Sequence, residues 1–382
     1  NGKIEEIVVG IYVDDCLIAS SSEEARQWFM KRIGDRFPVN QKSSGLITMK
    51  DPGLVLSMNV RYDIKKGILQ FDQKQSIELL AKKFEVINQK PRSLPFTHDI
   101  KLPKLKEAEV SQTDYLSIIG SCLHISQVSR PDISYSVGVL SRHSATPGKE
   151  HMKVALDLVN YLYNTKELSI QYNRESDGEM KIYEKASELE DLEKTSSLLE
   201  KSIEQRLEAS EPPKLSNELN MFADADYAGD RNTRRSTSGM IIMMNGGPIS
   251  WLSRLQKLCA LSTAEAEIYA VTESVKEAIH MKLLCEECGI RKMNRPMTVY
   301  EDNNACIHMG HGLRGSKAAK HYEVRLRFLH ENVRNKVIEF ARISTKKQLA
   351  DGFTKALPGP AFKDFRSKVL VDPNVETINN TA

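Results

Sequence analysis

The sequence of 382 residues lacks a long apolar run and a secretory signal, and it has few cysteines and little net charge. No stretch approaches the roughly 20 apolar residues that a membrane-spanning helix needs. The six cysteines form no regular framework, which favours a reducing compartment over a disulfide-stabilised fold. These absences argue against a membrane protein or a secreted disulfide scaffold, and the length suffices for two or three cores.

The small net charge is unevenly distributed. Residues 174–213 carry twelve acids against six bases, a net charge of −6, which leaves +9 for the remainder of a chain whose total is +3. A basic remainder is expected of a protein that binds phosphate backbones, although general solubility charge explains a small excess equally well. Within the acidic segment, leucines at helical spacing precede Glu211-Pro-Pro, which favours an exposed linker helix over a partner-binding coiled coil.

Four acidic residues in the last third of the chain occupy different expected elements. Asp224 is expected within a strand, Glu267 at the start of a helix, Asp302 at the end of a second strand and Asp351 in a second helix. Clustered carboxylates repel one another unless cations lie between them, and oxygen ligands suit Mg²⁺. Two such ions roughly 3.5–4 Å apart can stabilise both the attacking and the leaving oxygen of a phosphodiester. The acids therefore predict a site with two Mg²⁺ ions, or Mn²⁺ in their place.

Local patterns predict the elements that carry Glu267 and the strands before it. Ser262 with Glu265 is a capping-box pattern, so a helix is expected to begin there with Glu267 facing inward. Residues 239–251 contain Asn245-Gly-Gly between two β-prone runs, which predicts a hairpin.

Two further helical regions follow from the same reasoning. Thr345 with Gln348 repeats the capping pattern, which puts Asp351 in the second turn of another helix. Tyr115–Leu140 and His151–Tyr163 are expected to be helical, with a kink or boundary at Pro131.

A second acidic pair lies near the N-terminus. Asp14 and Asp15 are flanked by two apolar, β-prone runs, which predicts a hairpin with both acids at its tip. At a tight turn both carboxylates can serve one metal site, and an ordinary polar turn is the alternative.

Several strings resemble one known family. FADADYAGD, LSTAEAEIYA, EDNNACI and QLADGFTKALP occur in the order found in the ribonuclease H domain of copia-type LTR retrotransposon Pol polyproteins. Upstream, YVDD resembles the reverse transcriptase motif, and MKDPGLVLSMNV follows the copia-type polymerase. The resemblance implies catalytic and metal-binding roles for six acids: Asp224, Glu267, Asp302, Asp351, Asp14 and Asp15.

The resemblance also implies the architecture, a multi-domain α/β and α+β chain from the C-terminal part of Pol. A partial reverse-transcriptase palm and thumb would precede a ribonuclease H-like domain, whose five-stranded mixed sheet is flanked by helices. The expected boundaries are a palm with YVDD at 1–90, thumb or connection helices at 91–173, a charged linker helix at 174–213, the ribonuclease H-like domain at 214–372 and a disordered tail at 373–382. In the family a third aspartate and a nucleotide-binding segment precede YVDD, whereas this sequence begins at Asn1. We therefore expect little or no DNA synthesis from this chain.

The expected activity is endonucleolytic cleavage of the RNA strand of an RNA–DNA hybrid. Hybrid and template–primer duplex are the implied partners, with no membrane and with self-association left open. The candidates to bind backbone phosphates or to control product release are Lys317, Lys320, His321 and Arg325. A structural role is the alternative for the histidine. The cytoplasm, including a virus-like particle, or the nucleus is the expected location. A catalytically inactive remnant that binds nucleic acid or acts as a scaffold is the alternative function.

Overall fold

The computed structural model describes residues 5–13, 15–37, 45–97, 100, 102–174, 218–289, 295–312 and 322–373. Asp14, nearly all of the expected linker at 174–213 and residues 374–382 of the expected tail lie outside these ranges. Within the described ranges, no helix combines the length and the apolar character needed to cross a membrane.

The N-terminal hairpin is confirmed. β1 (Ile7–Tyr12) and β2 (Asp15–Ser20) pair in antiparallel fashion with Tyr12 opposite Asp15. The helix α1 (Glu23–Gly34) follows, and the Ser22 hydroxyl caps it by accepting from the Ala25 amide at 3.0 Å. Ala25 is the one buried apolar side chain among the described residues of these three elements, so this part of the chain has almost no core of its own.

A four-stranded antiparallel sheet and a group of helices come next. The sheet consists of β3 (Gly53–Val55), β4 (Met58–Asp63), β5 (Ile68–Asp72) and β6 (Ile170–Asn173). Between β5 and β6 the chain forms α2 (Lys74–Lys83), α3 (Gln112–Val128), the 3₁₀ turn η1 (Pro131–Ile133), α4 (Ser134–Ser141) and α5 (Lys149–Asn164). The predicted helix boundary at Pro131 is confirmed, because proline disfavours helical backbone at the residue before it.

The second half of the chain builds a five-stranded mixed sheet, as predicted. Its strand order is β11-β10-β7-β8-β9. β7 (Asn220–Asp226), β8 (Thr237–Met244) and β9 (Gly247–Leu255) are antiparallel, whereas β10 (Met297–Glu301) and β11 (Ile338–Arg342) run parallel to β7. The β8–β9 turn places Asn245 and Gly246 at φ values of 51° and 88°, which suits the type I′ turn of a two-residue hairpin.

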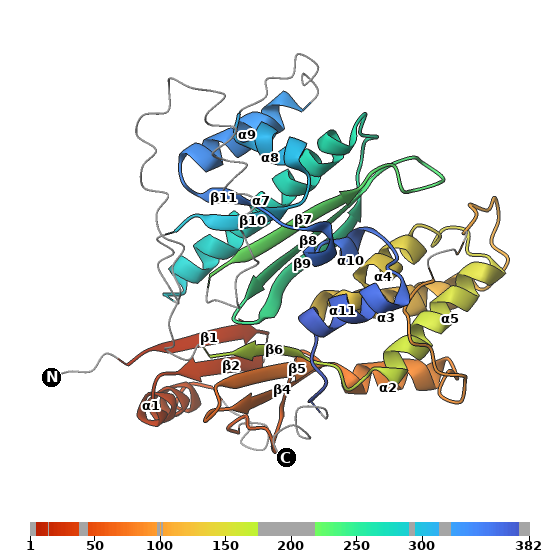
Figure 1. Cartoon of the computed structure of the whole chain (residues 1–382). Helices are drawn as coiled ribbons and strands as arrows, with labels where there is room; N and C mark the ends of the chain where they lie inside the picture. The colour runs from red at the N-terminus through yellow and green to blue at the C-terminus, as the bar shows by residue number, and fades with distance from the viewer. Residues whose placement is uncertain are drawn as a thin grey trace, which may run out of the picture.

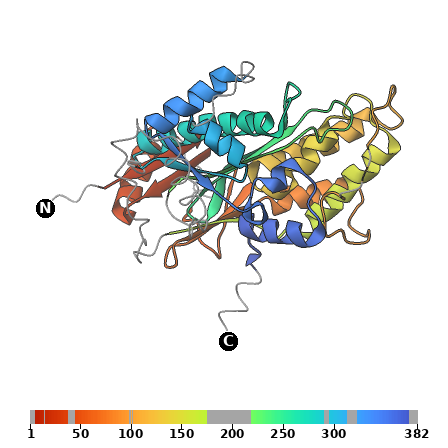
Figure 2. The same cartoon turned by 45° about the horizontal axis from the view of Figure 1, so that its top comes forward.

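Helices cover both faces of this sheet. α7 (Thr263–Glu287), α8 (Asn304–Gly310) and α9 (Glu323–Arg334) lie on one side, and α4, α10 (Asp351–Thr354) and α11 (Gly359–Val369) lie on the other (Figure 1). The turned view also shows α7 and α9 side by side (Figure 2). Alternation along β7 explains the two faces, because Met221 and Ala223 join the core under α7 while Phe222 joins the core on the opposite side.

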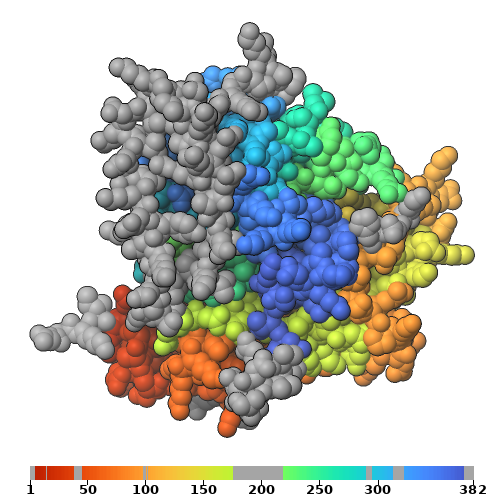
Figure 3. Space-filling view, viewed as in Figure 1, coloured from red at the N-terminus to blue at the C-terminus, as the bar shows by residue number. Residues whose placement is uncertain are grey.

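The core on the α4 side is continuous across the expected domain boundary. Tyr115 and Leu158 from the upstream helices share it with Phe222 of the sheet. The indole of Trp251 on β9 donates to the Ser126 carbonyl oxygen at 2.7 Å, so α3 is tied to the sheet edge. In the space-filling view the C-terminal segment (blue) lies against the segment near residue 170 (Figure 3). The segments expected as thumb and as ribonuclease H-like domain therefore pack as one body, and the palm and thumb assignments stay predictions.

Candidate metal centre

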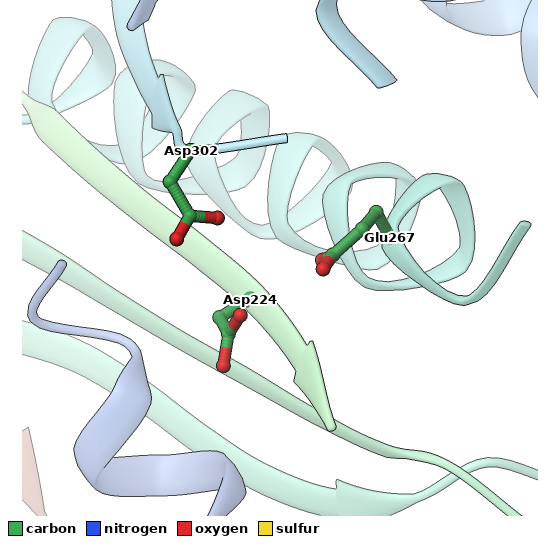
Figure 4. Close-up of side chains that lie close together, drawn as sticks. All are labelled: Asp224, Glu267 and Asp302. Atoms are coloured by element: carbon green, nitrogen blue, oxygen red, sulfur yellow. The ribbon is translucent and has the colours of Figure 1, made fainter. Parts of the chain in front are cut away.

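Three of the predicted acids meet at one edge of the five-stranded sheet. One carboxylate oxygen each of Asp224, Glu267 and Asp302 lies within 4.8 Å of the others. Figure 4 shows the side chains converging from β7, from α7 and from the residue after β10. Asp224 and Glu267 are buried, with 5% and 6% of their surface exposed, and Asp302 is half-buried.

The parallel pairing of β7 with β10 explains why two of these acids are neighbours. Phe222 lies opposite Tyr300, so Asp224 and Asp302 each follow two residues later at the same edge of the sheet. The carboxyl ends of parallel strands meet at one edge, which is where open α/β sheets hold ligands.

Glu267 arrives from the helix that the sequence predicts. The Ser262 hydroxyl accepts from the Glu265 amide at 3.1 Å, and the Glu265 carboxylate accepts from the Leu261 amide at 2.7 Å. The helix therefore begins as expected, although Glu265 reaches one residue further back than a capping box requires. Glu267 lies in the second turn and faces inward, and the Ala225 backbone N–H donates to its carboxylate.

The prediction of a helix beginning at Thr345 is wrong. A 3₁₀ turn, η3 (Thr345–Lys347), is followed by the extended residue Gln348 and a turn at 349–350, and α10 begins only at Asp351. The physical reason is that both expected capping side chains bind elsewhere. The Thr345 hydroxyl donates to Oδ2 of Asp302 at 2.7 Å, and the Gln348 amide donates to the carbonyls of Ala223 at 2.9 Å and Tyr300 at 3.3 Å. Gln348 thereby bridges β7 and β10 just before their acids.

Gly239 allows the short helix α10 to approach the sheet. It lies opposite Asp224 on β8, and a β-carbon there would lie 2.6 Å from Cγ2 of Thr354 and 2.8 Å from the Ala350 oxygen. The close approach lets the Thr354 hydroxyl donate to Oδ2 of Asp224. It also brings the Asp351 carboxyl into a hydrogen bond with that of Asp224. Asp351 is thus beside the three-acid group without being one of its members.

Burial and mutual repulsion disfavour ionisation throughout the site. Burial raises the pKa of Glu267 well above its ordinary value, and the charges of Glu301 and Asp224 raise it further. Burial likewise raises the pKa of Asp302. For Asp351, burial together with the charge of Asp224 raises the pKa to about 7. Such a site gains stability from any cation that compensates these carboxylates.

Glu301 is a buried acid that the sequence reasoning missed. Its side chain is fully buried, its Oε1 accepts from the Asn303 amide at 3.0 Å, and burial raises its pKa well above the ordinary value. The signal lay in the sequence, because Glu301 directly precedes Asp302. Strict strand alternation, however, would have assigned the two side chains to opposite faces.

The donor set of this site fits a divalent cation. Oε2 of Glu267 is buried without a hydrogen-bond partner, and a buried carboxylate oxygen left unpaired is costly. The three clustered ligands are all carboxylates, which suit a hard cation such as Mg²⁺ or Mn²⁺.

Arg325 is the one predicted substrate-binding residue that the structure describes. Lys317, Lys320 and His321 lie outside the described residues. The Arg325 guanidinium pairs with Glu273 at 2.8 Å and lies 4.2 Å from the centre of the Tyr269 ring, so its charge already has a partner.

The N-terminal pair has a different setting. Asp14 lies outside the described residues, and Asp15 is exposed at the hairpin tip. Among the residues that the structure describes, Asp15 joins no group of three metal-ligating side chains.

Comparison with known proteins points to transposon polyproteins. No protein-family model matches the chain. Several of its curated relatives are Pol polyproteins of copia-type retrotransposons, as the motifs predict. The retrovirus-related Pol polyprotein from transposon TNT 1-94 of Nicotiana tabacum is 29% identical over 94% of this chain and 24% of its own length. The corresponding polyprotein from transposon RE1 of Arabidopsis thaliana is 27% identical over 94% of this chain and 21% of its own length. The chain thus spans less than a quarter of these relatives.

Solved structures with some similarity are ribonucleases H. LC11-RNase H1 in complex with RNA/DNA hybrid shares 13% identity and a TM-score of 0.29, over 36% of this chain and 94% of its own. RNase H1 from Halobacterium salinarum shares 12% identity and a TM-score of 0.27, over 38% of this chain and 98% of its own.

Proposed function

We propose that the chain carries a ribonuclease H-type site that cleaves the RNA strand of RNA–DNA hybrids with the help of divalent metal ions. The observation that carries the proposal is the meeting of the Asp224, Glu267 and Asp302 carboxylates, together with the buried Oε2 of Glu267 that has no hydrogen-bond partner. The resemblance to copia-type Pol polyproteins supports the choice of substrate. A hybrid would be recognised by its backbone shape and by the 2′-hydroxyl in its shallow minor groove.

The side chains around the centre hold the acids in position for metal binding. Asp224, Glu267 and Asp302 would ligate the metal, with Asp351 beside them. The Thr354 and Thr345 hydroxyls orient two of these carboxylates before any ion arrives. When bound, Mg²⁺ would lower the pKa of a coordinated water and stabilise the leaving 3′ oxygen.

A hybrid-cleavage assay tests the proposal directly. The purified chain is incubated with a labelled RNA–DNA hybrid in Mg²⁺, and the RNA products are resolved by length and end group. We expect internal cuts that leave 5′-phosphates and that stop when EDTA removes the metal.

Variants of the acids give the matched comparison. Asp224→Asn should abolish cleavage while hybrid binding largely survives, because the amide removes a ligand charge and keeps the shape. Asp364→Asn, which alters an exposed acid on α11, should cleave like the wild type. Near-normal turnover by the Asp224 variant would exclude that residue as a ligand. Hybrid binding without Mg²⁺-dependent cleavage would favour the non-catalytic nucleic-acid-binding module instead.

A further inference from the structure

Lys355 places a positive charge beside the group formed by Asp224, Glu267, Asp302 and Asp351. It is the residue directly after α10, and its Nζ lies 2.8 Å from Oδ1 of Asp351. The charges of Asp224 and Asp226 also act on this ammonium group. The lysine is half-exposed, whereas the Asp351 side chain is only 13% exposed, so the ion pair lies at the rim of a buried acid group.

The turn at the end of α10 explains this placement. Lys355 has extended backbone at φ −146° and ψ 160°, which ends the helix, while its amide still donates to the Asp351 carbonyl oxygen at 3.3 Å. Because Gly239 lets α10 pack against the sheet, the same turn that delivers Asp351 to Asp224 also delivers the lysine.

The carboxylates of Asp351 and Glu267 therefore differ in whether a positively charged side chain pairs with them. At Asp351 the ammonium of Lys355 already supplies a positive charge. Oε2 of Glu267 and Oδ1 of Asp351 both lack a hydrogen bond, but only Oδ1 of Asp351 has the ammonium at 2.8 Å. The Lys355 charge also acts on Asp224 and Asp302, yet its ion-pair contact is with Asp351, so an ion binding beside Asp351 would compete with that contact directly.

We propose that Lys355 is a positioning residue whose ammonium group competes with a metal ion for the carboxylate of Asp351. On this account, which rests on the proposed function, the first divalent ion binds at Asp224, Glu267 and Asp302. A second ion binds beside Asp351 only by displacing the Lys355 ammonium. Lys355 thus sets the metal concentration at which the second position fills.

Titration of the chain with Mn²⁺ alone tests this inference without any nuclease assay. Electron paramagnetic resonance counts the bound ions, and calorimetry gives the affinity of each. The wild type should bind one ion tightly and a second weakly. Lys355→Met should tighten the second ion at least about tenfold, since a like charge is removed from a poorly solvated site. Lys368→Met is the matched control, because Lys368 forms a 2.7 Å ion pair with Asp364 at the same i,i+4 spacing on an exposed helix face. Its isotherm should match the wild type.

Two further measurements test the role of Lys355 even if Lys355→Met folds poorly. Lys355→Arg retains the charge and should keep the second ion weak. In the wild type, the ¹⁵N signal of the Lys355 ammonium should stay in place through the first equivalent of Mg²⁺ and shift during the second. A second-ion affinity unchanged by Lys355→Met, or an ammonium signal that moves with the first equivalent, overturns the role of Lys355.

The outcome separates this inference from the proposed function. Loss of the first ion in Asp224→Asn, together with unchanged second-ion binding in Lys355→Met, would refute the lysine role alone. Failure of the wild type to bind any Mn²⁺, or an isotherm that Asp224→Asn leaves unaltered, would refute the metal site and the lysine role together.

Discussion

The hairpin with Asp15 and the sheet edge with Asp224 carry acids of the same kind in opposite surroundings. On the hairpin, the neighbouring apolar side chains of Ile11 and Val13 are 70% and 82% exposed. At the sheet edge, Asp224 is 5% exposed and the residues beside it on β7 are buried. An acidic motif gives the positions of the acids in the sequence. Only packing of the surrounding core holds several carboxylates close to one another. The contrast therefore supports the proposal that metal binds at the sheet edge.

The largest effect should come from removing one clustered acid. We expect Asp302→Asn to abolish hybrid cleavage, because it removes one of the three convergent ligands. Asp15→Asn should leave cleavage at the wild-type rate, since that acid joins no such group among the described residues. Initial rates on one hybrid substrate give the comparison. Equal losses in both variants would mean that the two regions act together and that the contrast drawn here is mistaken.

A smaller loss should follow from displacing α10. Gly239→Ala inserts a β-carbon against Thr354 and the Ala350 carbonyl oxygen, so α10 must move away from Asp224. We expect cleavage to fall by roughly tenfold or more and stability to fall by about 1–3 kcal/mol, as overpacking usually costs. Gly120→Ala is the control, because nothing lies within 4 Å of its added β-carbon. Rates and urea unfolding measure both effects, and wild-type behaviour of Gly239→Ala would contradict the close approach.

Without metal, the contribution of the clustered acids to stability should fall as the pH rises. Burial and the charge of Asp224 raise the pKa of Asp351 from 3.8 to about 7, and burial raises the pKa of Glu267 and Asp302. Between about pH 4 and pH 7 the folded chain therefore holds a proton on Asp351 that the unfolded chain has released. The contribution of Asp351 to the free energy of unfolding therefore declines across this window, whereas His143, whose pKa burial lowers to about 4, contributes in the opposite direction.

Thermal melts with and without metal measure this effect. In EDTA we expect the wild type to lose a few degrees of Tm relative to Asp351→Asn from the acidic to the neutral end of the window, because the variant lacks this titration and the other groups contribute equally to both. Mg²⁺ should raise the Tm of the wild type by binding the folded state alone. A Tm difference that stays constant over this range would contradict the repulsion among these acids.

The smallest expected signal is DNA synthesis. Asp15 is exposed and joins no group of three metal-ligating side chains among the described residues, so the hairpin should hold a metal pair poorly. We expect no measurable primer extension by the purified chain on a template–primer duplex. Extension that disappears in Asp14→Asn would show that this expectation is mistaken and that the hairpin is a working polymerase site.

Local sequence patterns correctly predicted those elements around the site that depend on interactions between residues close in the sequence. Ser262 caps its helix, Pro131 marks a helix boundary, and Asn245-Gly246 closes its hairpin, because each effect acts within a few residues. The segment from Thr345 onward is the counterexample. Its capping pattern was present, yet long-range hydrogen bonds to Asp302 and across β7 and β10 prevailed over the local preference.

The order of the acids and the resemblance of their strings to copia-type Pol polyproteins were legible in the sequence. Neither could show that Glu301 is buried beside them, or that Asp351 and Lys355 lie next to Asp224. Those facts depend on how β7, β10 and α10 pack, with contacts between residues more than a hundred positions apart. Tertiary packing alone sets such distances, and electrostatic energies among buried charges depend on them.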